Sequence, residues 1–372
     1  MNTFRRTVAF AAALALTTAA ALADRIYLTN GTSLDGVDIA NETLAGVTYR
    51  AKGKSGEQSV QADQVLRVEY AKLPRLVDEA LSDAEDDNLQ SAIDTLSDFA
   101  NGVLSGENKR DKQLWAPGYA LYRAIEFCAA VASQESLQRI VTLSDTLVEK
   151  LPDSRYVPLA LISKASALRD LGKGKEAGET ITALRTLVST KALSEAFKLE
   201  ADLLDIETGS LKGQQRRDKL LEVQGKAGSQ YPLVKSRARV LEAQTYIEGE
   251  TKDFSKARQI YDAVIKDPKA DDATLAGAYT GMGDCLFQEA SEKFRTGGDA
   301  SVILRDAVLS YLRVVLVYKD QSRYVPKAMF QAGRTFEMMG EGRKPDARRM
   351  YSSVIQHYPG SEWASLAKSA RK

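Results

Sequence analysis

The sequence has little of the chemistry on which enzymes commonly depend. Among 372 residues it has one histidine, His357, and two cysteines, Cys128 and Cys285. One imidazole and two distant thiols cannot supply the three or four ligands of a typical zinc site. No glycine-rich phosphate loop, nucleophile elbow or acidic metal-binding loop is found, and residues 171–175 lack the spacing of a phosphate loop. We therefore expect a chain that is not an enzyme and that holds no metal or cofactor.

Charge of one sign is not in excess either. Lysine and arginine total 51, and aspartate and glutamate total 50. A balanced chain offers no electrostatic basis for binding nucleic acid or an anionic membrane. Beyond the N-terminal segment, long apolar runs are also missing. The best of them, 308–318, is interrupted by Arg313 and falls short of the roughly 20 residues that span a bilayer. We expect no stable membrane insertion.

What is present at the N-terminus predicts export. Arg5 and Arg6 precede an apolar stretch over 8–16, and small residues follow it. This order of basic, apolar and small residues is typical of a secretory signal peptide, which is removed after translocation. The apolar stretch is too short for a membrane anchor, and no lipid-attachment cysteine follows it. We expect a signal peptide over 1–23, cleaved before Asp24, and a soluble periplasmic or secreted protein.

The region 24–72 has the twofold alternation of short strands. Asn30-Gly31 favours a hairpin turn in which both residues have positive φ. Alternating runs joined by tight turns predict a small, strongly curved sheet or barrel, and the pattern resembles an SH3-like or Sm-like barrel. This all-β region could bind a ligand, tether the array that follows or cap the first apolar face of that array. We favour the cap, because the ends of a solenoid need covering. The five runs are 24–29, 33–40, 46–50, 59–61 and 65–70.

From residue 73 the apolar period lengthens to that of helices, and internal repeats appear. The block Ser154-Arg-Tyr-Val-Pro158 recurs unchanged at 322–326, and a second gapless match joins 238–265 to 328–355. A repeated helical hairpin has an apolar face that it cannot bury alone, so hairpins must stack. The repetition therefore predicts a helical solenoid.

Small and aromatic residues recur at fixed places in these repeats. A small residue midway along each first helix lets the second helix approach closely, and an alanine near the start of the second helix has the same role. A tyrosine one turn after that alanine is expected to fill the gap between neighbouring hairpins. The small residues are Ala165, Ala243, Gly283 and Gly333, the alanines are Ala177, Ala257, Ala307 and Ala347, and the tyrosines are Tyr261, Tyr311 and Tyr351.

This pattern resembles the tetratricopeptide repeat. The residues that match its small–aromatic–glycine…alanine–aromatic…proline framework are Gly333, Phe336, Gly340, Ala347, Tyr351 and Pro359. The stretch 351–364 is similar to the hairpin edges of tetratricopeptide proteins of the bacterial envelope, including the periplasmic coordinator of the Tol–Pal system and the outer-membrane assembly lipoprotein. The period is nearer forty residues than thirty-four, and the lipid-attachment cysteine of the lipoprotein family is missing.

The repeat spacing predicts a mostly α fold over 73–372, with about seven hairpins. We expect them near 75–104, 114–150, 154–190, 192–229, 232–267, 271–319 and 321–358, with a final capping helix from residue 361. The hairpin at 192–229 lacks the small and aromatic markers and is predicted from periodicity alone. Several repeats separate Cys128 from Cys285, which places their Cα atoms beyond the roughly 7 Å that a disulfide permits.

The first helices of such an array line its concave side, which commonly serves as a docking groove. The resemblance therefore implies a non-enzymatic scaffold that binds a partner peptide or helix by charge and hydrogen bonding. Two alternatives stay open: a self-assembling structural protein of the envelope, and a regulatory subunit of an envelope hydrolase. Neither the partner nor the oligomeric state follows from the sequence. The side chains expected in the groove are Arg169, Arg237, Gln244, Asp284, Gln288, Lys327 and Arg334.

Overall fold

The computed structural model describes residues 23–51, 53–86, 88–106, 114–248, 251–319, 321 and 323–371. The expected signal peptide lies outside these residues, except for Ala23. Ser322, the first residue of the second Ser-Arg-Tyr-Val-Pro block, also lies outside them.

An antiparallel sheet opens the chain, and its strands run in the order β4-β3-β2-β1-β5. Every ladder is antiparallel, and among the described residues β4 and β5 form the two edges. The strands are β1 (Asp24–Leu28), β2 (Ser33–Thr43), β3 (Gly46–Ala51), β4 (Gln58–Gln61) and β5 (Val65–Glu69), with the 3-10 turn η1 (Ala62–Gln64) before β5. Alternate residues of each strand turn inward because the pleat has a period of two. The buried core of the sheet is Ile26, Val37, Val47, Tyr49, Val60, Val65 and Val68.

The turn between β1 and β2 differs from the expected one. Gly31 has a φ of 85°, but Asn30 is not among the non-glycine residues with positive φ in the described chain. Instead, the Asn30 Oδ1 accepts hydrogen bonds from the backbone N–H of Thr32 at 2.9 Å and from its hydroxyl at 2.7 Å. A local side-chain bond of this kind replaces the second left-handed residue, so the prediction of two positive φ values was wrong for Asn30.

Fifteen α-helices follow in the described residues, and the prediction of a mostly α solenoid behind a small β region is confirmed. The helices are α1 (Arg75–Glu85), α2 (Leu89–Leu104), α3 (Ala116–Val131), α4 (Gln134–Lys150), α5 (Val157–Asp170), α6 (Gly174–Thr190), α7 (Glu195–Thr208), α8 (Gly213–Ala227), α9 (Pro232–Thr245), α10 (Phe254–Ile265), α11 (Asp272–Arg295), α12 (Ser301–Val317), α13 (Val325–Met338), α14 (Lys344–His357) and α15 (Glu362–Ala370).

Local signals set where these helices begin and end. Pro158 and Pro326 occupy the first turns of α5 and α13, where a missing N–H costs nothing. Gly172 and Gly340 lie in the turns that follow those helices and have φ values of 74° and 104°. Such values are open to glycine at little cost, so each hairpin turns tightly at this point.

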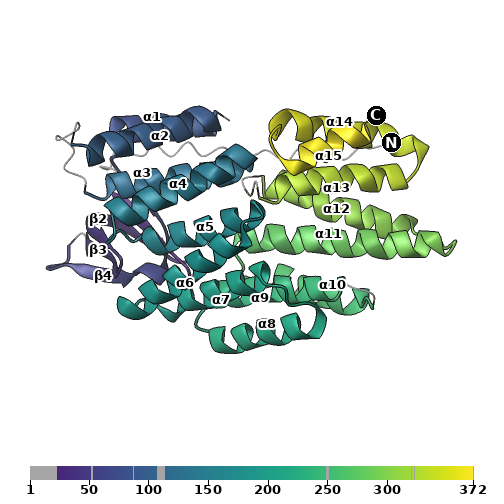
Figure 1. Cartoon of the computed structure of the whole chain (residues 1–372), viewed down its shortest axis with the longest axis horizontal. Coiled ribbons are helices and arrows are strands. Elements are labelled where there is room, and N and C mark those ends of the chain that lie inside the picture. The colour runs from purple at the N-terminus through teal and green to yellow at the C-terminus, as the bar shows by residue number, and fades with distance from the viewer. Residues whose placement is uncertain are drawn as a thin grey trace, which may run out of the picture.

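The hairpins stack into a curled array (Figure 1). The first helices of neighbouring hairpins, from α3 through α5, α7, α9 and α11 to α13, contact one another and form the inner layer. In Figure 1 the chain descends from α1 to α6, passes through α7 to α10, and rises again through α11 to α15. The turn before α15 returns to the start of α4, because a Cβ built on Gly360 would lie 2.5 Å from the Cβ of Ser133. The end of the array therefore contacts its second hairpin.

Tyrosine rings pack against glycines inside the array. A Cβ on Gly283 would lie 2.5 Å from the ring of Tyr311, and a Cβ on Gly333 would lie 2.5 Å from the ring of Tyr351. Each ring therefore lies against the first helix of its own hairpin, and Tyr311 also belongs to a core cluster that includes Val325 and Ala328 of the next hairpin. Tyr261 does bridge hairpins, since its ring lies against a glycine of α11.

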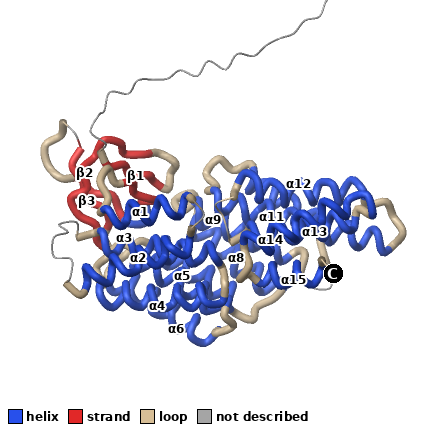
Figure 2. Tube along the Cα trace, turned by 90° about the horizontal axis from the view of Figure 1, so that it is seen from above, coloured by secondary structure: helices blue, strands red, loops and turns tan. Residues whose placement is uncertain are grey.

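The sheet packs beside the helical array (Figure 2). Tyr70 stacks on Trp115 just before α3, with ring centroids 3.6 Å apart. The N–H of Leu44 donates to the carbonyl of Asp153 before α5, and the hydroxyl of Ser194 before α7 donates to a carboxylate of the sheet region. The sheet thus contacts the starts of three successive hairpins. A cap would cover only the exposed face of the first hairpin, so these contacts are more extensive than a cap requires.

The strongest link between the two regions is a buried ion pair. The Arg155 guanidinium contacts the Glu42 carboxylate, and the two side chains are only 4% and 2% exposed. The Tyr70 hydroxyl donates to the same carboxylate, while the Arg155 Nη2 donates to the Tyr156 hydroxyl at 2.6 Å. The pair therefore joins strand β2 to the loop before α5.

Cys128 and Cys285 are both buried free thiols. Burial raises the pKa of each thiol to about 12, so both remain protonated at neutral pH. Within the part of the chain that the structure describes, we find no helix with the length and apolar character needed to cross a membrane.

Candidate functional site

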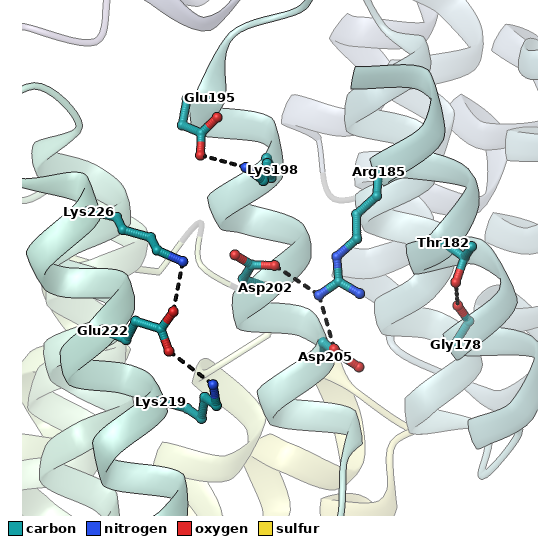
Figure 3. Close-up of polar contacts among 10 residues, drawn as sticks. All are labelled: Gly178, Thr182, Arg185, Glu195, Lys198, Asp202, Asp205, Lys219, Glu222 and Lys226. Atoms are coloured by element: carbon teal, nitrogen blue, oxygen red, sulfur yellow. Dashed lines mark hydrogen bonds and ion pairs between the residues drawn. The ribbon is translucent and has the colours of Figure 1, made fainter. Parts of the chain in front are cut away.

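Helix α7 carries carboxylates on two opposite sides. On one side Asp202 and Asp205 accept hydrogen bonds from Arg185 of α6 at 2.8 and 3.0 Å, as Figure 3 shows. On the other side Glu200 and Glu207, two turns apart, contact arginines of other hairpins.

The inner side of α7 is the centre of a five-residue ionic cluster. The Glu207 carboxylate lies 3.3 Å from Arg169 of α5, 3.3 Å from Arg237 of α9 and 3.8 Å from Arg323 before α13. Arg237 also pairs with Glu200. We call these five residues the Glu207 cluster. Because its members come from four hairpins, the cluster forms only when the array has curled.

Burial and charge act in opposite directions on the two carboxylates of the cluster. Burial raises the pKa of Glu200, and Arg237 only partly offsets that rise. Burial also acts on Glu207, but the surrounding arginines outweigh it and hold its pKa below the ordinary glutamate range. The arginines of the folded array therefore favour the ionised form of Glu207.

A second group of inner side chains lies around Asp284 of α11. Its carboxylate accepts hydrogen bonds from the Lys327 ammonium at 2.6 Å and from the Tyr311 hydroxyl at 2.8 Å. This group joins α11, α12 and α13. Of the side chains expected in the groove, Asp284 and Lys327 thus contact each other, whereas Arg169 and Arg237 belong to the Glu207 cluster.

The other expected groove residues are less constrained. Arg334 of α13 lies 4.8 Å above the ring of Phe287, and its Nη1 donates to the amide oxygen of Gln331 at 3.3 Å. Gln244 is exposed at the end of α9, and Gln288 is half-buried on α11. The structure therefore arranges the seven expected side chains as two ionic groups and three separate polar residues.

Three members of the Glu207 cluster were missed by the sequence reasoning. Glu200 and Glu207 lie in the hairpin without markers, so no inner face could be assigned there. Arg323 had a usable signal, because it occupies the same place as Arg155 in the recurring Ser-Arg-Tyr-Val-Pro block. The two arginines reach different carboxylates, since Arg155 pairs with Glu42 of the sheet.

We expect the Glu207 cluster to make stability depend on pH. At pH 7, Glu207→Gln should lower the free energy of unfolding by about 2 kcal/mol, because the partly buried guanidinium groups of Arg169 and Arg237 lose a counter-charge. Because the pKa of Glu207 is lower in the folded protein than in the unfolded chain, its ionised form stabilises the fold fully at any pH above the ordinary glutamate pKa. This stabilisation is lost as the pH falls through the pKa that Glu207 has in the folded protein. The difference between wild type and Glu207→Gln, measured by urea denaturation, should therefore shrink in acid. A difference that stays constant down to pH 3 would contradict this assignment.

Fold and inner face together define a tetratricopeptide-like helical solenoid, a fold that suggests a protein–protein interaction scaffold. Residues 327–361 match the family model described as the tetratricopeptide repeat.

Two solved structures are similar to the chain at low identity. One is a tetratricopeptide repeat protein from Parabacteroides merdae, with 14% identity, coverage of 80% of this chain and 96% of that chain, and a TM-score of 0.41. The other is the apo form of the quorum sensor NprR from B. thuringiensis, with 12% identity, 78% coverage of each chain and a TM-score of 0.41. No curated protein matches the sequence.

Proposed function

We propose that the chain is a non-enzymatic scaffold that binds a segment of a partner protein along its concave inner face. The inner layer consists of the first helices, whose side chains approach one another across the curled array. Polar and charged groups recur along this layer from α5 to α13. No cluster of three or more potential metal ligands occurs among the residues described, and the proposal needs no metal.

The chemistry of the inner face favours an acidic segment. The observation that carries this is Arg323, whose side chain is 46% exposed and whose nearest carboxylate is 3.8 Å away at Glu207. Arg334 forms no ion pair within the described ranges and contacts an aromatic ring and an amide. Two incompletely paired guanidinium groups on one face bind carboxylates with directed hydrogen bonds.

For the location we propose the periplasm or the extracellular space. The support is the order of basic, apolar and small residues over 1–23, together with the likeness of 351–364 to envelope tetratricopeptide proteins. Within this proposal, the chain could act in the envelope as the periplasmic coordinator of the Tol–Pal system does.

The test is crosslinking in the native envelope followed by mass spectrometry of the captured proteins. The variant Arg323→Glu with Arg334→Glu should lose captured partners about tenfold or more, because like charges then face an acidic segment. Lys175→Glu is the matched control, since Lys175 is 91% exposed on α6. Its partners should be unchanged.

Far-UV circular dichroism separates lost binding from lost folding in these variants. If the doubly reversed protein is folded and still captures the same partners in the same amounts, the inner face is not the docking site.

A further inference from the structure

Helix α12 exposes a row of large aliphatic side chains. Val302 is 57% exposed, Leu309 57%, Leu316 73% and Val317 62%. The first three are seven residues apart, which places them along one face of the helix over about 21 Å. The opposite face packs into the array through Leu304, Ala307, Val308, Tyr311 and Val314.

This row is unusual within the molecule. The described residues include eleven exposed large hydrophobic side chains, and four of them lie on α12. Every other helix contributes at most one. Single exposed aliphatic residues are ordinary, but a contiguous apolar patch commonly marks an interaction surface. The row on α12 is therefore a candidate interaction surface, and the question is which molecule binds it.

Charged side chains flank this apolar row on both of its edges. Asp306 and Arg313 lie on the same edge of it, two turns apart, and Leu309 lies midway between them on the row itself. Arg305 lies on the other edge, and Leu312 lies on that edge two turns further along the helix. The Asp306 carboxylate lies 3.4 Å from the guanidinium of its neighbour Arg305, and both side chains are about half exposed. Arg313 donates to the Tyr279 hydroxyl at 2.9 Å.

We propose that this face of α12 binds the same face of a second copy of the chain, with the two helices antiparallel and a twofold axis passing at Leu309. In that arrangement Leu309 meets Leu309 of the second copy, and Val302 meets Leu316. Asp306 then faces Arg313 of the second copy, and the twofold axis repeats that ion pair. Arg305 lies opposite Leu312 of the second copy, over which its aliphatic stem can pack.

The self-complementary order is what selects a second copy over other partners. An antiparallel twofold pair brings together residues whose numbers lie symmetrically about 309, as those of Val302 and Leu316 do. Asp306 and Arg313 lie three and four residues from Leu309 on the same edge, so they meet with an offset of about 1.5 Å along the helix axis. An acidic helix or an anionic lipid surface would leave Asp306 against like charge. One helix face buries less than the roughly 800 Å² per partner of a standard interface, so the dimer should dissociate on dilution.

Sedimentation velocity over a range of protein concentrations tests the proposal. Wild type should shift from monomer to dimer as concentration rises, and Leu309→Glu should remain monomeric over the same range. Leu221→Glu is the matched control, because Leu221 is the one exposed large hydrophobic residue of α8 in the described chain. This variant should dimerise like wild type. Wild type that stays monomeric at the highest soluble concentration, or a dimer unaffected by Leu309→Glu, would overturn the proposal.

Charge exchange tests the antiparallel register. Asp306→Arg alone and Arg313→Asp alone should each weaken dimerisation, because like charges then meet across the interface. The doubly exchanged protein should recover it, and an equimolar mixture of the two single variants should form a mixed dimer. If this face binds a partner other than a second copy, neither the doubly exchanged protein nor the mixture should recover dimerisation. If neither recovers it, this interface is rejected, even if the protein dimerises through another surface.

A cysteine on the twofold axis gives an independent check. Leu309→Cys should crosslink two chains under mild oxidation, since both native thiols are buried. Leu221→Cys should not. Equal crosslinking of the two variants would indicate random collision and contradict the pairing.

Discussion

Replacing Arg155 with methionine should lower the free energy of unfolding by about 4 kcal/mol. The substitution leaves the Glu42 carboxylate buried with the Tyr70 hydroxyl as its remaining partner. A buried charge without its counter-ion costs several kcal/mol, far more than the net value of the pair itself. Because the pair joins β2 to the loop before α5, the loss should appear as lower stability of sheet and helices together. Urea denaturation followed by far-UV circular dichroism at pH 7 measures it.

Two further variants make the result interpretable. Removing both charges, as Glu42→Leu with Arg155→Met, should recover most of the loss, because no unpaired charge remains. Arg50→Met breaks an exposed ion pair of the same sheet, with Glu57 at 2.7 Å, and should cost less than about 0.5 kcal/mol. If Arg155→Met costs no more than Arg50→Met, water reaches Glu42 and the two regions are not coupled through this pair.

Tyr311→Ala should be comparably damaging, at about 4 kcal/mol. The ring is fully buried and lies on Gly283, where the absence of a side chain leaves room only for an aromatic face. Truncation to alanine opens a cavity between α11 and α12 that two packed helices cannot close. Thermal and urea unfolding of the full chain would record the change.

Tyr311→Phe separates packing from hydrogen bonding at the same position. It retains the ring and removes only the hydroxyl that donates to Asp284, which keeps Lys327 as a partner at 2.6 Å. We expect a loss of about 1 kcal/mol. Equal losses for the alanine and phenylalanine variants would mean that the hydrogen bond, and not the ring on Gly283, stabilises this hairpin.

The helical part of the fold was open to prediction because its information is local and repeated. Gly283 and Tyr311 recur as Gly333 and Tyr351, and each glycine meets the aromatic ring of its own hairpin. Small and large residues at fixed spacing are enough to define two helices and their close approach. What they do not define is which glycine a ring contacts, because Tyr261 lies against a glycine of the next hairpin and Tyr311 against one of its own.

The candidate site was only partly predictable. Arg169 and Arg237 could be assigned to the inner face from the repeat spacing, but Glu207 could not, because its hairpin has no markers. Their contact depends on how far the array curls, and curvature accumulates from small rotations between hairpins. Spacing along the chain does not encode that sum, so Arg323 and Glu207 could not be paired from the sequence.

The sequence by itself determined a small β region, a helical array of repeated hairpins, and the scarcity of residues with catalytic chemistry. Each of these follows from local period, turn residues or composition, which act within a few residues along the chain. Only the tertiary structure decided where the repeated Ser-Arg-Tyr-Val-Pro arginines go. Arg155 is buried against Glu42 at the junction with the sheet, and Arg323 reaches Glu207 across the inner face. The local sequence is the same in both copies, but the acid that an arginine meets depends on which distant element packs beside it.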